Sequence, residues 1–220
     1  MDELYTLEEY QKQAFRNVMN TSRTVKGVVD VSASDTKADA MQLLDGSSAK
    51  DIALRNYLDA VCFVYENRDI SFDTASSLQD FILTIGKIIN KGILKEGYLL
   101  RRPGRVNPEF HYEDAEKLEE AFYLVCERFL AYVHESKDPV YLAAYLEYYL
   151  NMKLHLFADG CGKSSKIAAA FILMRNRLPL PVYRTNEEYY RYAPTFAGKY
   201  FSVEDNEEFE GFVSYYRTLF

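Results

Sequence analysis

The chain has 220 residues, a length that fits one main hydrophobic core with an appendage, because single cores usually run to about 100–200 residues. Its 26 Lys and Arg residues stand against 33 Asp and Glu residues, which gives a formal net charge of −7. This acidic balance argues against a broad surface that grips nucleic-acid phosphates or anionic lipid, so we expect neither nucleic acid nor membrane as a partner.

Short apolar runs and sparse cysteines point to a cytoplasmic protein. The longest apolar run, residues 167–174, is far shorter than the ~20 residues that a membrane-spanning helix needs. The first residues, 1–4, are acidic and lack the pattern of a secretory signal. Three widely spaced cysteines suggest neither a disulfide framework nor a zinc site, and they are Cys62, Cys126 and Cys161.

Apolar residues recur three and four positions apart in most segments, and this spacing predicts a mainly α protein. The stretch 31–35 is small and polar, so we expect it to be an irregular connection. We expect helices over residues 6–20, 48–67, 73–90, 114–134, 139–154, from the following loop to about 176, from 185 and from 206. Asp138 is expected to cap the helix that begins with Pro139.

Two features stand out from the helical pattern. One is Glu66, which stands at the C-terminal end of its helix, where a carboxylate is unfavourable because the helix dipole already places partial negative charge there. Residues 97–106 contain glycine and proline that forbid a long helix, and the stretches 98–101 and 105–106 flank a turn. The sequence therefore predicts a short β-hairpin there.

The loop from His155 to Lys166 lies between two expected helices and favours phosphate. Gly160 and Gly162 allow positive φ angles that turn several amides toward one point, and the helix that follows adds its unpaired N–H groups and positive dipole end. Lys163 stands three residues before Lys166, so both ammonium groups are expected to reach the same anion.

The same loop carries groups for catalysis. Asp159 is a candidate ligand for Mg²⁺, which needs one or two carboxylates and otherwise uses phosphate oxygens and water. His155, with a reference pKa near ~6.5, suits proton abstraction from an attacking hydroxyl. Taken singly, a histidine at a helix end is more often a capping group and two lysines are more often a solvated face. The fixed order of base, aromatic, carboxylate, glycines and two cations within twelve residues favours a transfer site.

A Walker A loop is the first rival interpretation, because residues 162–164 read Gly-Lys-Ser. That motif would need glycine at position 157, which is Phe157, and a strand before the loop where helical spacing is found. The sequence therefore disfavours it.

The order His-x-Phe-x-Asp-Gly-x-Gly resembles the signature of the Fic (Fic/Doc) family, whose usual form is His-Pro-Phe-x-Asp/Glu-Gly-Asn-Gly-Arg-x-x-Arg. The matching residues are His155, Phe157, Asp159, Gly160 and Gly162. The resemblance implies a Fic-type helical bundle with a β-hairpin flap at residues 97–106, a core over residues 61–220 and an N-terminal helical extension over residues 1–60.

The family resemblance also implies an activity. Fic enzymes typically move AMP from ATP to a hydroxyl side chain of a target protein. By that analogy His155 is the general base, Asp159 the Mg²⁺ ligand and Phe157 the anchor of the loop in the core. The nucleotide-binding residues would be Gly160, Cys161, Gly162, Lys163 and Lys166. The flap would align a segment of the target by strand addition, which requires an unpaired edge.

Three residues depart from the family pattern at the phosphate. Cys161 replaces an asparagine, and a thiol is only a weak hydrogen-bond donor. Lys163 and Lys166 replace arginines, which keeps the charge but loses the planar fork. AMP transfer is therefore expected to be weakened, retuned or lost.

Many Fic proteins are self-inhibited by a helix with the pattern Ser/Thr-x-x-x-Glu-Gly/Asn. Residues 62–67 depart from that pattern only at Cys62. The resemblance implies that Glu66 pairs with Lys166 and holds the terminal phosphate of the nucleotide away. The competing interpretation is an ordinary exposed glutamate.

Three functions follow from the resemblance. The first is a Mg²⁺- and ATP-dependent transferase of AMP that restrains itself. The second is a catalytically degenerate Fic-like protein that binds a nucleotide or a partner. The third keeps the enzyme but changes the reaction, as the Doc branch does in phosphorylating its target.

Overall fold

A computed structural model describes residues 5–21, 49–95, 97–102, 115–192 and 207–220, and within these ranges the chain is helical. The predicted irregular stretch 31–35 and the second half of the predicted hairpin, residues 103–106, lie outside the described ranges. The helices are α1 (Leu7–Thr21), α3 (Ala49–Glu66), α4 (Ala75–Ile89), α5 (Leu118–His134), α6 (Pro139–Glu147), η1 (Tyr148–Lys153), α7 (Cys161–Arg175), α8 (Asn186–Tyr190) and α9 (Glu207–Arg217). The predicted mainly α class is confirmed.

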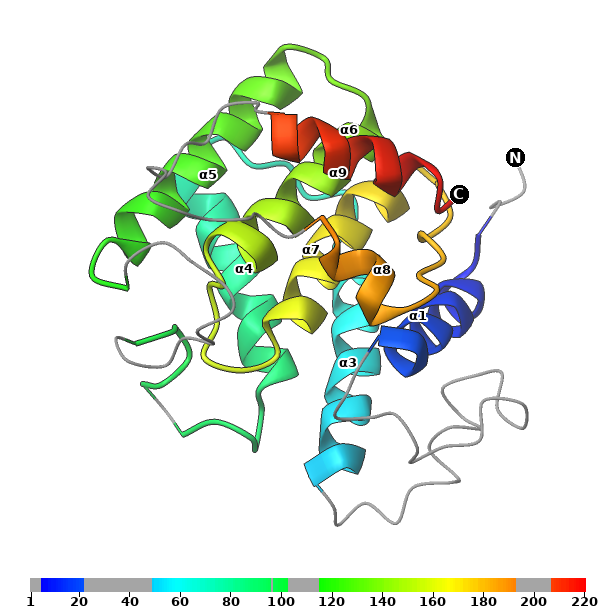
Figure 1. Ribbon diagram of the computed structural model, residues 1–220. Helices are drawn as coiled ribbons and strands as arrows, with labels where there is room; N and C mark the ends of the chain where they lie inside the picture. The colour runs from blue at the N-terminus through cyan, green and yellow to red at the C-terminus, as the bar shows by residue number, and fades with distance from the viewer. Residues whose placement is uncertain (1–4, 22–48, 96, 103–114, 193–206) are drawn as a thin grey trace.

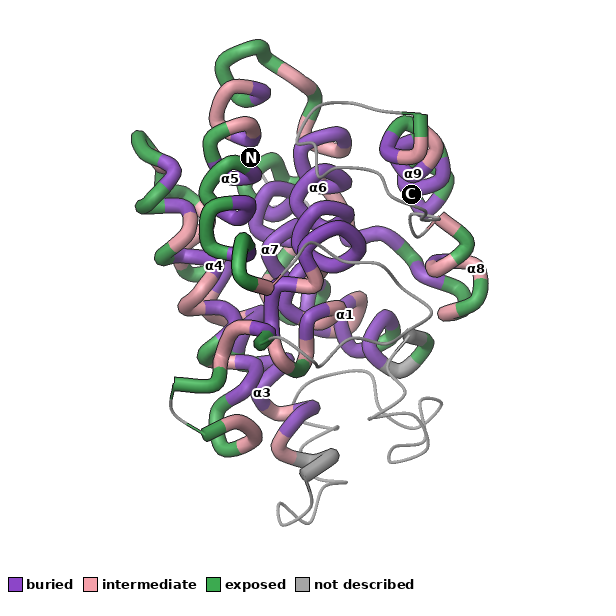
Figure 2. Tube along the Cα trace, turned by 60° about the vertical axis from the view of Figure 1, so that its left-hand side comes forward, coloured by how far each residue is buried: buried purple, intermediate pink, exposed green. Residues whose placement is uncertain are grey.

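Helix α7 lies at the centre of the bundle, where α3, α4 and α6 surround it (Figure 1). Residues 167–174 are all buried, so this helix is apolar on every side, as expected of a helix inside a bundle. Helix α6 is likewise buried along most of its length, whereas α5 exposes an outer face (Figure 2). No helix within the described ranges is long and apolar enough to cross a bilayer.

Helix starts follow the capping residues. Asp138 accepts hydrogen bonds from the amides of Val140 and Tyr141 at 3.1 and 3.0 Å, with Pro139 at the first helical position, as the sequence predicts. Helix α4 begins slightly later than expected, because Thr74 forms a capping box with Ser77. These caps fix the residues at which α4 and α6 begin.

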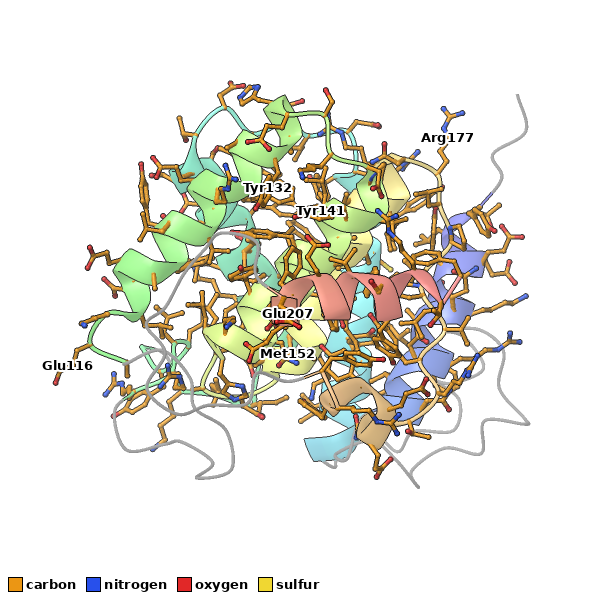
Figure 3. All side chains as sticks on the ribbon, turned by 45° about the horizontal axis from the view of Figure 1, so that its top comes forward. Glu116, Tyr132, Tyr141, Met152, Arg177 and Glu207 are labelled. Atoms are coloured by element: carbon orange, nitrogen blue, oxygen red, sulfur yellow. The ribbon has the colours of Figure 1, made fainter. Side chains whose placement is uncertain are left out.

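Aromatic rings fill the space between α5, α6 and α9. The rings of Tyr132 and Tyr141 meet edge to face, with centroids 5.5 Å apart (Figure 3). Phe209 of α9 packs against Tyr141 and Tyr145 in the same manner. These ring contacts join the C-terminal helix α9 to α6, which leads through η1 into the loop that begins at His155. Arg177, at the other end of the bundle, points out to solvent (Figure 3).

Helix α3 runs without a break through the boundary expected between residues 60 and 61. Leu58 and Ala60 on one side, and Val61 and Val64 on the other, are fully buried in the same core. Helix α1 packs against α3, so the described part of residues 1–60 shares the core of the bundle.

The helix expected over residues 139–154 changes its hydrogen bonding halfway. Helix α6 ends at Glu147 and continues as the π-helix η1, after which the amide of Leu154 donates to the carbonyl of Tyr149 at 2.9 Å. Such wider turns are rare and are frequently found beside functional sites. The sequence spacing did not predict this turn, which leads directly into the motif loop.

Candidate functional site

The motif loop, residues 154–160, is a tight turn between η1 and α7, and the rest of the motif, up to Lys166, forms the start of α7. Two of its residues have left-handed backbone conformations, His155 with a φ of 44° and Gly160 with a φ of 65°. A non-glycine residue pays a steric penalty there, because its Cβ crowds the backbone. The surrounding structure must therefore hold His155 in place.

Helix α4 supports the loop at Gly160. A Cβ atom added to Gly160 would lie 2.8 Å from Cγ2 of Ile89, so both the φ angle and the close approach require glycine. The side-chain amide of Asn90 donates to the carbonyl of Asp159 at 3.1 Å and to that of Gly86 at 3.0 Å. The C-terminal end of α4 thus fixes the turn that precedes α7.

Phe157 lies entirely in the core. Its ring sits on Gly86, and a Cβ at that glycine would overlap the ring. A glycine at this point of α4 therefore makes room for the aromatic residue of the motif.

The segment 99–101 pairs with the motif loop. The amide of Arg101 donates to the carbonyl of Leu156 at 3.0 Å, and the amide of Ala158 donates to that of Leu99 at 2.9 Å. Leu100 and Phe157 form an isolated antiparallel bridge between these two bonds. One edge of the segment 99–101 is therefore occupied by the chain's own motif loop, and a flap with a second, unpaired edge for a target segment stays a prediction.

Arg101 is a site residue that the sequence did not single out. Its side chain is buried, and Nε donates to the carbonyls of Leu154 and His155 at 3.3 and 3.2 Å. Nη2 donates again to Leu154 at 3.1 Å. The only sequence signal was a charged residue ending an apolar run, and that signal is equally typical of an exposed strand end.

His155 is half-buried, and its pKa is lowered from the ordinary value chiefly by burial and then by the charge of Arg101. A backbone hydrogen bond with Asn151 and the charge of Asp159 act in the opposite direction. The imidazole is therefore neutral at pH 7, which is the state that can accept a proton.

The first turn of α7 offers backbone donors. Gly160 occupies the N-cap position and supplies no side-chain cap. The amides of Cys161, Gly162 and Lys163 come next, and the structure gives none of them a hydrogen bond among the described residues. Such amides, together with the positive end of the helix dipole, favour an anion.

The side chain of Cys161 does not face this turn. Its thiol is buried and donates to the carbonyl of Leu150 at 3.2 Å, and burial raises its pKa to about 12. The thiol therefore points into the core, and only the backbone amide of Cys161 is left for the predicted contact with a nucleotide.

Lys163 and Asp159 carry opposite charges at the open end of the loop. Asp159 is exposed and Lys163 is half-buried. Burial lowers the pKa of Lys163, and the neighbouring carboxylate of Asp159 works against that change. No three His, Cys, Asp or Glu side chains gather into a metal cluster within the part of the chain described. A Mg²⁺ ion at Asp159 would need phosphate oxygens and water for its other ligands, which is its usual mode.

Lys166 is turned away from the loop and paired inside the protein. Its Nζ lies 3.5 Å from Oε1 of Glu147, whose side chain is completely buried, and 3.8 Å from the centre of the Tyr189 ring. Burial lowers the pKa of Lys166, and Glu147 opposes this. Glu147 already compensates the charge of Lys166 in this structure, so only Lys163 is left with an exposed neighbouring carboxylate, and an anion shared by the two lysines stays a prediction.

Tyrosines complete the surroundings of Glu147. Tyr183 donates a hydrogen bond of 2.5 Å to Oε2, and the pKa values of Tyr183, Tyr189 and Tyr216 are raised well above the ordinary value, chiefly by burial and then by Glu147. Asn151 of η1 donates to the hydroxyl of Tyr189 at 3.0 Å. The charge pair is thus enclosed by phenols that hold their protons at neutral pH.

Glu66 is exposed at the end of α3, and the structure gives it no ion pair among the described residues. No ion pair between Glu66 and Lys166 is present among the described residues, and the inhibitory role of Glu66 stays a prediction. The carboxylate that pairs with Lys166 belongs to Glu147 of α6, and no local sequence motif predicted this partner.

A pocket of about 320 Å³ borders the motif loop at Ala158. Leu94 and Leu100 contribute apolar walls, while Lys95 and Arg102 are exposed cations in its lining. Its size is at the lower end of small-molecule sites. The remaining lining residues are Ile93 and Tyr98.

Comparison with solved structures identifies a similar fold. A Fic domain containing signaling protein from Bacteroides thetaiotaomicron VPI-5482 matches with a TM-score of 0.68, at 16% sequence identity, over 95% of this chain and 84% of that one. No protein-family model matches the sequence, and no curated protein does. The helical bundle that carries the loop from His155 to Lys166 is therefore the fold of a Fic-domain protein.

Proposed function

We propose that the protein transfers AMP from ATP to a hydroxyl side chain of a target protein. The observation that supports this most directly is that one short loop carries two groups suited to the reaction. His155, whose pKa is lowered, stands at its start, and the uncapped first turn of α7 follows at its end. A base at one end and an anion-binding turn at the other are what transfer of a phosphate-bearing group requires.

The proposed reaction uses the residues of this chain in distinct roles. His155 takes the proton of the target hydroxyl as that oxygen forms a bond to the α-phosphorus, and the bond to the β-phosphate oxygen breaks to release pyrophosphate. The amides of Cys161 and Gly162, with the ammonium group of Lys163, stabilise negative charge on the phosphate oxygens. Bound Mg²⁺, held by Asp159 and phosphate oxygens, would neutralise further charge.

The pocket beside Ala158 would take an apolar part of a substrate. Its leucine walls suit a flat or aliphatic group, and the cations Lys95 and Arg102 suit a nearby negative charge. In this proposal the phosphate lies at α7 and the rest of a substrate extends toward segment 99–101.

Labelled ATP tests the transfer. Purified protein, incubated with cell lysate, Mg²⁺ and ATP labelled at the α-phosphate, should label a target protein. Label should be lost in His155→Ala and strongly reduced in Lys163→Met, while His134→Ala, a change at an exposed histidine of α5, should leave it unchanged. Absence of label from wild type in every lysate would contradict transferase activity, and label only from the γ-position would show phosphate transfer instead.

A second candidate is a catalytically degenerate protein that binds a nucleotide or partner. Two observations favour it, since the thiol of Cys161 faces the core and Lys166 is neutralised by Glu147, so the phosphate loses two contacts. Calorimetry distinguishes the two functions. Nucleotide binding that survives His155→Ala, without turnover by wild type, would favour binding alone.

A further inference from the structure

The backbone at His155 is held in an unfavourable conformation. Its φ of 44° is left-handed although the residue carries a Cβ. The turn directly follows the π-helix η1, which ends at Lys153, so the carbonyls of Leu154 and His155 lie beyond the hydrogen bonds of that helix. Something outside the loop must satisfy those carbonyls and keep the turn closed.

Arg101 supplies those contacts from a distant part of the chain. Its guanidinium donates three hydrogen bonds to the carbonyls of Leu154 and His155, between 3.1 and 3.3 Å. Its own amide donates to Leu156, so backbone and side chain together grip three consecutive residues of the loop. A guanidinium suits this role because its donors lie in one rigid plane.

From these contacts we infer that Arg101 is the positioning residue of His155, because it fixes the turn that carries the imidazole. Arg101 reaches the imidazole through the backbone of the loop, so it positions the base and is not itself assigned a contact with substrate. The inference rests on the proposed function only in giving His155 the role of base.

The neighbouring Arg102 provides a matched control. It is exposed, its Nη2 donates to the carbonyl of Gly97 at 2.9 Å, and its guanidinium lies 4.0 Å from the centre of the Tyr98 ring. It has the same chemistry at the next position in the chain, and its two contacts are with Gly97 and Tyr98 of its own segment instead of the motif loop. Arg101→Met and Arg102→Met therefore remove equal charge from the same segment.

The test measures the imidazole of His155 by NMR on protein with labelled histidine, without metal or nucleotide. The charged groups that act on His155 are Arg101, which lowers its pKa, and Asp159, which raises it. Arg101→Met should raise the pKa of His155 and shift its ring signals, whereas Arg102→Met should change neither. Arg101→Lys should keep the pKa near that of wild type but still shift the ring signals, because lysine keeps the charge and loses the fork.

Each outcome decides the inference. Unchanged His155 signals in a folded Arg101→Met protein would overturn it. So would unfolding of both Arg101 variants while Arg102→Met melts as wild type does, since Arg101 would then support the fold in general. The expected NMR changes in a protein that labels no target would uphold the inference and defeat only the proposed function. In an active protein, Arg101→Met should lower kcat with little change in the KM for ATP.

Discussion

The two lysines of the motif loop have opposite surroundings, although they stand three residues apart on one helix. Lys163 is half-buried beside the exposed carboxylate of Asp159 and the uncapped amides of α7. Lys166 lies behind them, paired with the completely buried Glu147 and enclosed by tyrosine rings. A pattern of two spaced cations therefore does not show that both bind a ligand, because the rest of the fold decides which charge is already compensated.

The largest expected effect comes from breaking the buried pair. Lys166→Met should lower the free energy of unfolding by about 3–5 kcal/mol, because it leaves the charge of Glu147 buried without its cation. Lys163→Met should cost less than about 1 kcal/mol, because the exposed Asp159 remains hydrated. Chemical denaturation of the two variants measures both values.

The double variant Glu147→Leu with Lys166→Met is the control for that pair. Removing both charges should restore much of the stability, since a buried ion pair replaced by apolar residues is often neutral or better. If Lys166→Met alone proved as stable as wild type, the buried pair would not be what separates the two lysines.

A second contrast concerns two helical glycines, one at the motif loop and one remote from it. Gly86→Ala should destabilise the protein by about 1–3 kcal/mol, because the new methyl group overlaps the ring of Phe157. Gly211→Ala in α9 meets nothing within 4 Å and should stabilise by about 0.5–1 kcal/mol, as alanine favours a helix. Thermal melts of both variants test the difference. Equal shifts would mean that Phe157 is not anchored on α4.

Local patterns predicted much of this fold. Helical spacing and caps such as Asp138 identified the helices, because those signals lie within a few residues of each other in the chain. The motif loop was located correctly between two helices for the same reason. Gly160 has the expected positive φ, whereas Gly162 lies in the first turn of α7 and does not. What is local in sequence was predictable.

Contacts between distant segments were not predictable in the same way. Glu147 and Arg101 meet the motif loop or its helix only after the bundle has packed, and neither carries a local signature. Glu66 had such a signature and proved to be exposed. The π-helix η1 also escaped prediction, because its hydrogen bonds span one residue more than those of an α-helix while all six of its residues are buried, so no apolar stripe marks the change.

A third prediction concerns the strained turn on the accessible side of the motif. His155→Gly should be more stable than His155→Ala by about 1 kcal/mol, because both lose the imidazole and only glycine adopts a φ of 44° without strain. Denaturant titrations of the two variants give the difference. Alanine as stable as glycine would show that the turn relaxes once the side chain is removed.

The smallest expected effect is the pH dependence that His155 confers. Its pKa is lowered in the folded protein, so the unfolded chain binds the proton more tightly, and the stability that neutral His155 contributes is lost as pH falls below about 6.5. One such group changes the free energy of unfolding by at most about 1.4 kcal/mol per pH unit, and only down to its folded pKa. Denaturation between pH 7.5 and pH 5 should therefore show a shallower loss for His155→Asn than for wild type, whereas His134→Asn should follow wild type because His155 is still present. If His155→Asn and wild type lost stability in parallel, the imidazole would be no harder to protonate in the folded protein than in the unfolded chain. The contrast between the accessible and the buried side of the motif would then rest on the two lysines alone.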